Sequence, residues 1–284
     1  MGIQVKHIFY TYQKKATNAT LALKDVSFEI KDNEFVAIVG ETGSGKSTLA
    51  QTFNALLVPD QGDVLVGDYL INYKNRKSRK LRGLRQHVGL VFQFPEYQLF
   101  EETVEKDVAF GVKNFGVKNE EALERAHVAL KQVGLDETYY KRAPFDLSGG
   151  EKRKVALAGI LAINPDILIF DEPTIGFDPQ SSKDLMSLIC DFHKQGKTII
   201  VITHDMDLVN TYAQRAILLE QGQLAFDGSP AELFEFIKGY DRLDVPAVVK
   251  MAAKLKEKGM NIDPRDIRDA DDLIAAIKKW RNKA

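Results

Sequence analysis

The chain has 284 residues, of which 44% are hydrophobic and 28% are charged, and its formal net charge at pH 7 is −1. This composition is typical of a globular protein, and it excludes a disordered chain, a fibrous chain and a strongly basic nucleic-acid-binding protein. The length allows one large α/β domain with a small appendage. The longest uncharged apolar run, residues 155–163, is shorter than the roughly 20 residues that span a bilayer, and no signal-peptide pattern opens the chain. We therefore expect a cytosolic chain, unless a partner holds it at a membrane.

The first elements are predicted to be antiparallel strands followed by a buried strand. Val26, Phe28 and Ile30 alternate with polar residues, which favours a half-exposed strand. Residues 35–39 form a continuous apolar run, followed by a glycine-rich turn and a helical pattern that begins at Ser47. This order predicts strand, loop and helix.

The middle of the chain predicts a largely parallel sheet with an inserted helical subdomain. Two buried runs, residues 167–170 and 199–202, are separated by a helical stretch that ends near Gly196, which indicates right-handed βαβ units. The only cysteine, Cys190, lies in that stretch and is interpreted as a small core residue. Residues 103–145 lack strand signals, and the pattern predicts helices with breaks near Gly116 and Gly134. We place the helical subdomain at about residues 95–160.

The last part of the chain predicts a closing hairpin and a helical extension. Residues 216–219 and 224–227 flank a Glu-Gln-Gly-Gln turn, so the main α/β domain is expected to occupy residues 1–240. Residues 241–284 hold two amphipathic patterns too short to form a core of their own. This extension must pack on the main domain or on another subunit, and we interpret it as a dimerisation element.

Residues 40–47 read G-E-T-G-S-G-K-S, which fits the phosphate-binding pattern G-x-x-x-x-G-K-[ST] between a strand and a helix. Glycines let the backbone N–H groups approach phosphate oxygens, Lys46 neutralises β/γ charge, and Ser47 offers a hydroxyl to Mg²⁺. The alternative is a chance glycine-rich turn, which the placement disfavours. The predicted ATP-binding residues of this segment are Gly40, Glu41, Thr42, Gly43, Ser44, Gly45, Lys46, Ser47 and Thr48.

Two carboxylates follow the apolar run at residues 167–170. Ligands of parallel α/β sheets bind at the carboxyl ends of strands, so Asp171 is expected in the Mg²⁺ shell and Glu172 as the general base for the attacking water. The alternative, an Asp-Glu-Pro that simply ends a strand, is disfavoured once a phosphate-binding loop is present.

A third motif, Leu-Ser-Gly-Gly-Glu at residues 147–151, precedes a helical run. Ser148 and Glu151 have the spacing of a capping box, which alone is a complete structural explanation.

Together with this motif, the chain resembles the ABC ATPase family. The resemblance makes residues 147–151 the signature motif, with Lys152 where Gln is common, and it covers four other motifs in family order. These are Gln93 as the Q-loop glutamine, Asp171 with Glu172, residues 176–178 as the D-loop, and His204 as the switch histidine. The fold implied is an ABC-type P-loop NTPase core, a mainly parallel sheet with an antiparallel β subdomain.

The resemblance also implies how the residues divide between two subunits. Ser148, Gly149, Gly150 and Asp178 would act on ATP held by a second, homologous ATPase. Mg²⁺ would be held by Ser47, Gln93 and Asp171, and Glu172 and His204 would be catalytic. Tyr12 resembles the aromatic residue that stacks on adenine, although a strand tyrosine is commonly just packing.

A basic segment lies between the phosphate-binding loop and the Q-loop glutamine. Such a cluster could contact nucleic acid or lipid headgroups, but a solvated face is the favoured interpretation, so no nucleic-acid partner is expected. Its residues are Lys74, Arg76, Lys77, Arg79, Lys80, Arg82 and Arg85.

Residues 91–104, V-F-Q-F-P-E-Y-Q-L-F-E-E-T-V, followed by D-V-A-F-G at 107–111, are similar to the ATPases of energy-coupling factor (ECF) transporters, most of all their A′ type. That resemblance implies ATP hydrolysis at the cytoplasmic face of the cell membrane, energising uptake of a vitamin or metal ion. It also implies a heterodimer with a second ATPase, a transmembrane coupling subunit and a membrane substrate-capture subunit. The capture subunit sets the substrate.

The apolar side chains of this loop, Phe94, Tyr97, Leu99 and Phe100, are predicted to dock on the membrane partner; the alternative is that they fill the core of the helical subdomain. For the whole chain, a generic binding-protein-dependent ABC importer is the alternative function. A DNA-repair ATPase is disfavoured because no sustained heptads occur, and a switch GTPase because no Asn-Lys-x-Asp motif occurs.

Overall fold

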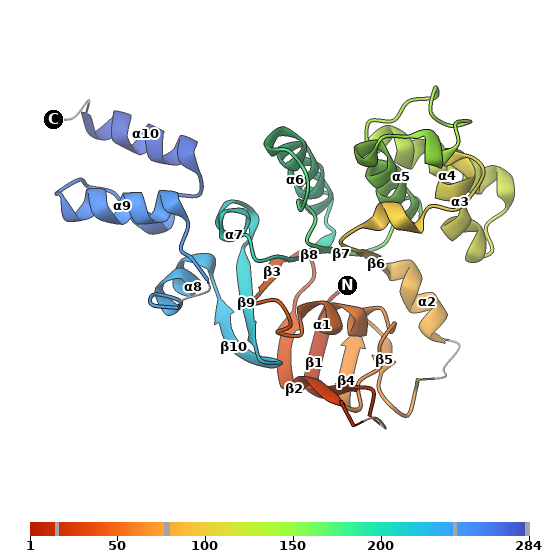
Figure 1. Ribbon diagram of the computed structural model, residues 1–284, viewed down its shortest axis with the longest axis horizontal. Coiled ribbons are helices and arrows are strands. Elements are labelled where there is room, and N and C mark those ends of the chain that lie inside the picture. Colours follow the sequence, from red (N-terminus) through yellow and green to blue (C-terminus); the bar gives the residue numbers. More distant parts are fainter. Residues whose placement is uncertain (15–16, 77–79, 241–242, 282–284) are drawn as a thin grey trace.

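The computed structural model describes residues 1–14, 17–76, 80–240 and 243–281 (Figure 1). Within these ranges the strands form two sheets, one of order β2-β1-β4-β5 and one of order β10-β9-β3-β8-β7-β6. Helices cover the second sheet, and two groups of helices lie at opposite ends of the long axis of the molecule (Figure 1).

The first sheet is antiparallel and comes from the amino-terminal part of the chain. It consists of β1 (Ile3–Tyr12), β2 (Thr20–Ile30), β4 (Gln61–Val66) and β5 (Tyr69–Ile71). In the second half of β2, Val26 and Ile30 are fully buried, Ser27 and Phe28 are half-buried, and Glu29 is exposed. The predicted half-exposed antiparallel strand is confirmed.

The second sheet is mainly parallel, as predicted. β3 pairs in parallel with β8 and β9, and β7 pairs in parallel with β6 and β8. The antiparallel hairpin of β9 and β10 closes it, and Gln221 (φ 48°) and Gly222 (φ 84°) form its turn. The strand bounds are β3 Phe35–Val39, β6 Val88–Val91, β7 Ile167–Asp171, β8 Thr198–Ile202, β9 Arg215–Glu220 and β10 Gln223–Gly228.

Successive side chains of the buried strands point to opposite faces of this sheet, and each face has its own helix. On one face, Ile167 and Ile169 belong to a cluster that includes Leu49 of α1. On the other face, Leu168 and Phe170 pack with residues of α6. These helices and the shorter ones around the sheet are α1 Lys46–Phe53, α2 Lys80–His87, α6 Pro179–Lys194, α7 Met206–Tyr212 and α8 Pro230–Phe236.

Three helices, α3 (Val104–Asn114), α4 (Asn119–Gln132) and α5 (Gly149–Leu161), follow β6 in the chain. The predicted breaks are present, because Gly116 and Gly134 lie just past α3 and α4 with φ of 90° and 77°. Short 3₁₀ helices at Pro95–Gln98 and Pro144–Asp146 precede α3 and α5. The buried apolar side chains of all three helices belong to the cluster on the α6 face of the sheet.

The chain ends in α9 (Ala247–Glu257), a 3₁₀ helix (Pro264–Asp266) and α10 (Ala270–Arg281). They enclose a small cluster of Ala252, Met260, Ile262 and Ile267. Buried Asn210 of α7 ties this extension to the main domain, because its Nδ2 donates to the carbonyl oxygens of Ile267 (2.8 Å) and Arg268 (2.7 Å).

Candidate ATP-binding and catalytic site

The phosphate-binding loop connects the end of β3 to the start of α1, and contacts inside the chain require glycine at positions 40 and 45. Gly40, Gly43 and Gly45 have φ of 143°, 83° and 102°. A Cβ on Gly40 would lie 2.2 Å from Leu219 O, and one on Gly45 would lie 2.7 Å from Ala22 O. Only glycine combines these dihedral angles with so close a backbone approach.

Lys46 is the first residue of α1, and its side chain folds back over the loop. It is 8% exposed, and its Nζ donates to the carbonyl oxygens of Gly40 and Glu41, each over 2.7 Å. Burial lowers the pKa of Lys46, while the nearby carboxylates of Glu172 and Asp171 act in the opposite direction. The loop therefore holds a buried cation with carboxylates close by.

The two predicted carboxylates lie at the carboxyl end of β7, separated from β3 by β8. Burial raises the pKa of Asp171, and a hydrogen bond with the Ser47 side chain opposes this. Glu172 has φ of 50°, an unusual value for a residue with a side chain, and its N donates to Ile202 O over 2.9 Å. The structure therefore brings Ser47 and Asp171 together and holds Glu172 in a strained conformation.

Two residues at the end of β8 contact the Glu172 carboxylate. His204 Nδ1 lies 2.7 Å from Glu172 Oε1, and Thr203 Oγ1 donates to Glu172 Oε2 over 3.3 Å. The His204 side chain is 64% exposed, whereas Thr203 is fully buried. Sequence reasoning missed Thr203, whose only signal is a polar residue at the carboxyl end of a buried strand.

Tyr12 and Thr48 contact each other between the antiparallel sheet and α1. The Tyr12 hydroxyl lies 3.1 Å from Thr48 Oγ1, and the Tyr12 ring meets Tyr10 edge-on, with centroids 4.9 Å apart. Tyr12 is 38% exposed, and Thr48 is buried. The Tyr12 ring is thus partly accessible beside the start of α1.

The other predicted residues of the nucleotide site lie on loops around it. Gln93 is exposed just after β6, the strand next to β7. Thr42 and Gly43 are exposed at the tip of the phosphate-binding loop, while Ser44 is buried and its Oγ has no hydrogen-bond partner among the described residues.

The donor set fits Mg²⁺. The hydroxyl of Ser47 and the carboxylate of Asp171 are adjacent, and magnesium prefers one or two protein oxygens together with substrate phosphates and water. Across the described part of the chain, no group of three or more His, Cys, Asp or Glu side chains could hold a metal ion. A metal site here would therefore be completed by the nucleotide.

The predicted signature motif opens α5. Ser148 is the N-cap and forms a capping box with Glu151: Ser148 N donates to Glu151 Oε2 over 2.8 Å, and Glu151 N donates to Ser148 Oγ over 3.4 Å. Gly149 and Gly150 are exposed, and a Cβ on either would meet no atom within 4 Å. The capping box thus explains the serine and the glutamate of this motif. No contact within the described part of the chain explains why glycine occupies positions 149 and 150.

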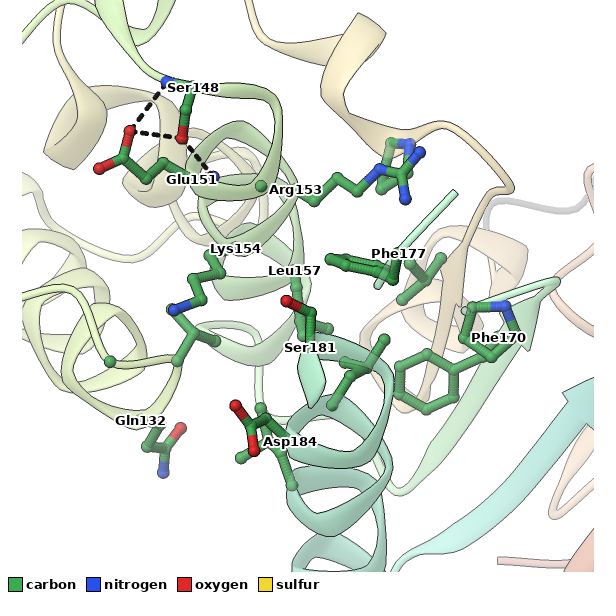
Figure 2. A pocket seen from close by; sticks show the side chains of 18 of the residues that line it. Gln132, Ser148, Glu151, Arg153, Lys154, Leu157, Phe170, Phe177, Ser181 and Asp184 are labelled. Atoms are coloured by element: carbon green, nitrogen blue, oxygen red, sulfur yellow. Dashed lines mark hydrogen bonds between the residues drawn. The ribbon is translucent and has the colours of Figure 1, made fainter. Parts of the chain in front are cut away.

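A cleft of about 510 Å³ separates α5 from α6, and Figure 2 shows Ser148 and Glu151 at one end of it. Gln93 and Phe177 also line this cleft. Asp178, the predicted D-loop carboxylate, is the N-cap of α6 and accepts from the backbone N of Gln180 and Ser181. The signature, Q-loop and D-loop motifs thus meet around one cleft.

The basic segment makes contacts within the chain. Arg85 donates to the carbonyl oxygens of Asn54 and Ala55, Arg82 donates to Asn114 O, and the Arg76 guanidinium lies 3.9 Å from the centroid of the Tyr73 ring. Lys77 and Arg79 lie outside the described residues. The contacts agree with a structural role for Arg82 and Arg85.

The four apolar side chains after Gln93 do not share one environment. Tyr97 is 84% exposed, and Phe94 and Phe100 are also exposed. Leu99 is buried at 7% within the cluster formed by the helices. The docking prediction is therefore wrong for Leu99, because this side chain points into the core, as the alternative interpretation stated.

Among the described residues, no helix combines the length and apolar character needed to cross a membrane.

A family model described as ABC transporter matches residues 23–175. The energy-coupling factor transporter ATP-binding protein EcfA2 of Streptococcus agalactiae serotype Ia is 45% identical over 280 residues, covering 98% of this chain and 99% of the relative. Its counterpart in Streptococcus thermophilus is 47% identical over 266 residues, covering 93% and 94%.

Solved structures agree with these relatives. CbiO1 of Clostridium perfringens, part of the ABC transporter complex cbiONQ, has a TM-score of 0.72 and 36% identity, covering 90% of this chain and 96% of its own. The ATP-binding cassette MJ0796, solved as a dimer in a post-hydrolysis state with ADP and Pi, has a TM-score of 0.71 and 31% identity, covering 80% and 98%. The chain belongs to the ABC transporter family and is an ATP-hydrolysing subunit of the energy-coupling factor type.

Proposed function

We propose that this chain forms half of each of two composite ATP sites in an ECF importer: it binds ATP on residues 40–48 and presents Ser148, Gly149 and Gly150 to ATP held by a second, homologous ATPase. The observation that carries the proposal is the contrast between two glycine-rich turns. Gly40 and Gly45 of the phosphate-binding loop are fixed by contacts inside the chain, whereas Gly149 and Gly150 face open space at a helix N-terminus. Such a terminus favours an anion, and a phosphate held by the second ATPase would supply one there.

The chemistry assigned to the site follows from its charges. Backbone N–H groups of the loop and the Lys46 ammonium would neutralise the phosphates, and Tyr12 would stack on adenine. Mg²⁺, held by Ser47, Asp171 and Gln93, would supply charge neutralisation between the β- and γ-phosphates. Glu172 would accept the proton of the attacking water, and Asp178 would act from the D-loop across the subunit boundary.

His204 supports Glu172 in this proposal. The 2.7 Å contact between His204 Nδ1 and Glu172 Oε1 fixes the carboxylate orientation on one side, and the Thr203 hydroxyl does so on the other. The exposed position of His204 suits a group that also reaches the γ-phosphate or the attacking water.

The test is Glu172→Gln in the assembled transporter. The amide keeps the shape of the side chain but cannot take a proton, so hydrolysis should fall by at least about 100-fold while ATP affinity stays within a factor of two. Glu121→Gln, which breaks an exposed ion pair on α4, is the matched control and should hydrolyse normally. Hydrolysis by the Glu172→Gln complex at a near wild-type rate would remove Glu172 from the role of base.

The exposed aromatic side chains after Gln93 are assigned to the transmembrane coupling subunit. Tyr97 and Phe100 are 84% and 56% exposed, and exposed aromatic side chains are common anchors of interfaces. Tyr97→Asp with Phe100→Asp should abolish recovery of the coupling subunit on purification while the melting temperature of the chain stays unchanged. Val128→Asp, at a 59% exposed apolar site on α4, should leave recovery intact. Normal recovery with the aromatic variant would reject this docking face.

The carboxyl-terminal extension is assigned to dimerisation with the second ATPase. Its two helices bury only a small cluster between themselves, and Met251, Ile274 and Trp280 remain exposed at 51%, 47% and 43%. These apolar side chains suit contact with the partner ATPase, in a heterodimer by analogy with A′-type subunits.

The proposed cargo is a vitamin or metal ion taken up through a membrane substrate-capture subunit, with the ATPase held at the cytoplasmic face of the cell membrane. The near full-length identity to ECF ATP-binding proteins favours this assignment over a generic binding-protein-dependent importer. Affinity purification from membranes separates the two, because the first function predicts a small membrane capture protein and the second a soluble binding protein.

A further inference from the structure

Arg153 lies in the second turn of α5, and its positively charged side chain is largely buried beside the cleft. Its side chain is 14% exposed, and its Nε donates to Glu96 Oε1 over 3.0 Å. Glu96, in the 3₁₀ helix that follows Gln93, is 13% exposed, and its Oε2 is buried with no hydrogen-bond partner among the described residues. Taking two charges out of water is costly, and an incompletely paired carboxylate makes this a poor source of stability. A contribution to stability therefore does not explain why this buried ion pair is present.

The guanidinium also contacts the loop that follows the catalytic carboxylates. Arg153 Nη1 donates to Ile175 O over 2.7 Å, and the guanidinium carbon lies 4.7 Å from the centroid of the Phe177 ring. Figure 2 shows Arg153 extending from α5 toward Phe177. The loop turns at Gly176, where φ is 75°, beside the guanidinium.

One side chain thus joins three segments that are far apart in the sequence. Arg153 follows Ser148 on the same helix, Glu96 follows Gln93 in the Q-loop segment, and Ile175 follows Glu172 after β7. A displacement of α5 would have to stretch the contacts to both other segments.

We infer that Arg153 is a positioning residue that couples the chain's own nucleotide site to α5, the helix that begins with the signature motif. It would hold Gln93 and Glu172 at fixed positions relative to Ser148. The inference rests on the proposed function, because the partner-held phosphate is what the start of α5 must reach. It adds a residue to the hydrolysis reaction that contacts no nucleotide and acts through the placement of those that do.

The contacts predict a graded series of variants. Arg153→Met keeps the length and apolar stem but loses the ion pair and the carbonyl bond. Arg153→Lys keeps a charge opposite Glu96 but cannot make both bonds at once, because it lacks the planar fork of arginine. Glu96→Gln keeps an acceptor for Arg153. Lys154→Met is the matched control, since Lys154 is the next residue of α5 and is exposed, with no hydrogen bond or ion pair in the described part of the chain.

The experiment measures ATP affinity of the isolated chain, and kcat and KM of hydrolysis by the assembled complex. We expect Arg153→Met to lower kcat by about 10- to 100-fold, because small misplacements far from the chemistry have effects of this size. KM and ATP affinity should change less than twofold. Arg153→Lys should recover part of kcat, Glu96→Gln most of it, and Lys154→Met should match the wild type.

Two outcomes would overturn the inference: kcat of the Arg153→Met complex within a factor of two of the wild type, or a lower melting temperature with normal kcat per folded complex. Ser148→Arg in the same series separates this from failure of the proposed function. If Ser148→Arg leaves hydrolysis intact, the composite site itself is wrong. If Ser148→Arg abolishes hydrolysis and Arg153→Met does not reduce it, only the positioning role of Arg153 fails.

Discussion

Two helices of the chain, α5 and α8, begin with the same hydrogen-bonded cap. At α5, Ser148 Oγ lies 2.7 Å from Glu151 Oε2 and accepts from Glu151 N over 3.4 Å. At α8, Ser229 Oγ lies 2.7 Å from Glu232 Oε2 and accepts from Glu232 N over 3.3 Å. Capping alone would make the two helix starts equivalent.

The helices differ in the two residues after the serine. α8 continues with Pro230 and Ala231, which suit the first turn of a helix, whereas α5 continues with Gly149 and Gly150, whose helix propensity is lower than that of alanine. Neither Gly149 nor Gly150 is crowded by its own chain. The comparison teaches that the cap accounts for the serine and glutamate of the signature motif, while the glycines fit the proposed approach of a phosphate from a partner subunit.

The largest expected effect tests the glycines that the chain itself requires. Gly40→Ala should lower the free energy of unfolding by about 2–5 kcal/mol, from backbone strain together with a 2.2 Å clash with Leu219 O. Gly196→Ala is the control, because its φ is also positive, at 90°, but open space surrounds it, so the loss should be about 1 kcal/mol. Denaturant unfolding of both variants measures the difference, and equal losses would contradict an internal requirement at Gly40.

The next effect tests the glycines that the chain does not require. Gly150→Val and Ala231→Val place the same side chain at the second position of α5 and α8. Gly150→Val should reduce hydrolysis by the assembled complex by about 100-fold, a size typical of losing one anion-stabilising donor, and leave ATP affinity of the isolated chain unchanged. Ala231→Val should leave both properties unchanged. A Gly150→Val complex with normal hydrolysis would make the two helix starts functionally equivalent.

The smallest effect concerns the shared cap. Hydrogen bonds from Ser148 hold the pKa of Glu151 below its usual range, and those from Ser229 do the same for Glu232. A carboxylate whose pKa is lower in the folded chain than in the unfolded chain stabilises the fold at pH values above the ordinary glutamate pKa of about 4.3. This stabilisation is lost as the pH falls through the pKa that the carboxylate has in the folded chain. Glu151→Gln and Glu232→Gln should therefore each lower the melting temperature slightly at pH 7, with a deficit that shrinks on acidification. A deficit independent of pH would exclude this carboxylate contribution.

The sequence predicted the parts of the fold that depend on local patterns. Continuous apolar runs gave the parallel strands around β3, β7 and β8, and the glycine turns at residues 116 and 134 gave the ends of α3 and α4. The loop glycines were predictable from their motif. The physical reason for Gly40 and Gly45, the approach of Leu219 O and Ala22 O, needed the folded chain, because these atoms come from distant strands.

The contacts that sequence reasoning missed join segments far apart in the chain. Nothing local distinguishes Arg153 from Lys154, yet only Arg153 reaches Glu96 and Ile175. Likewise, Tyr97 and Leu99 are both apolar residues of one short segment, and the turn of the 3₁₀ helix exposes the first and buries the second. A pattern in a loop has no fixed period from which the buried side could be predicted.

The claim that the start of α5 acts across a subunit boundary is tested most directly by two serine variants with the same loss of cap. Ser148→Arg and Ser229→Arg should each lose about 0.5–2 kcal/mol of stability, and both should bind ATP normally as isolated chains. In the assembled transporter, only Ser148→Arg should abolish hydrolysis at the partner's phosphate-binding loop, because bulk and charge then occupy the anion site. Loss of ATP affinity in the isolated Ser148→Arg chain, or equal hydrolysis by the two complexes, would contradict the composite site.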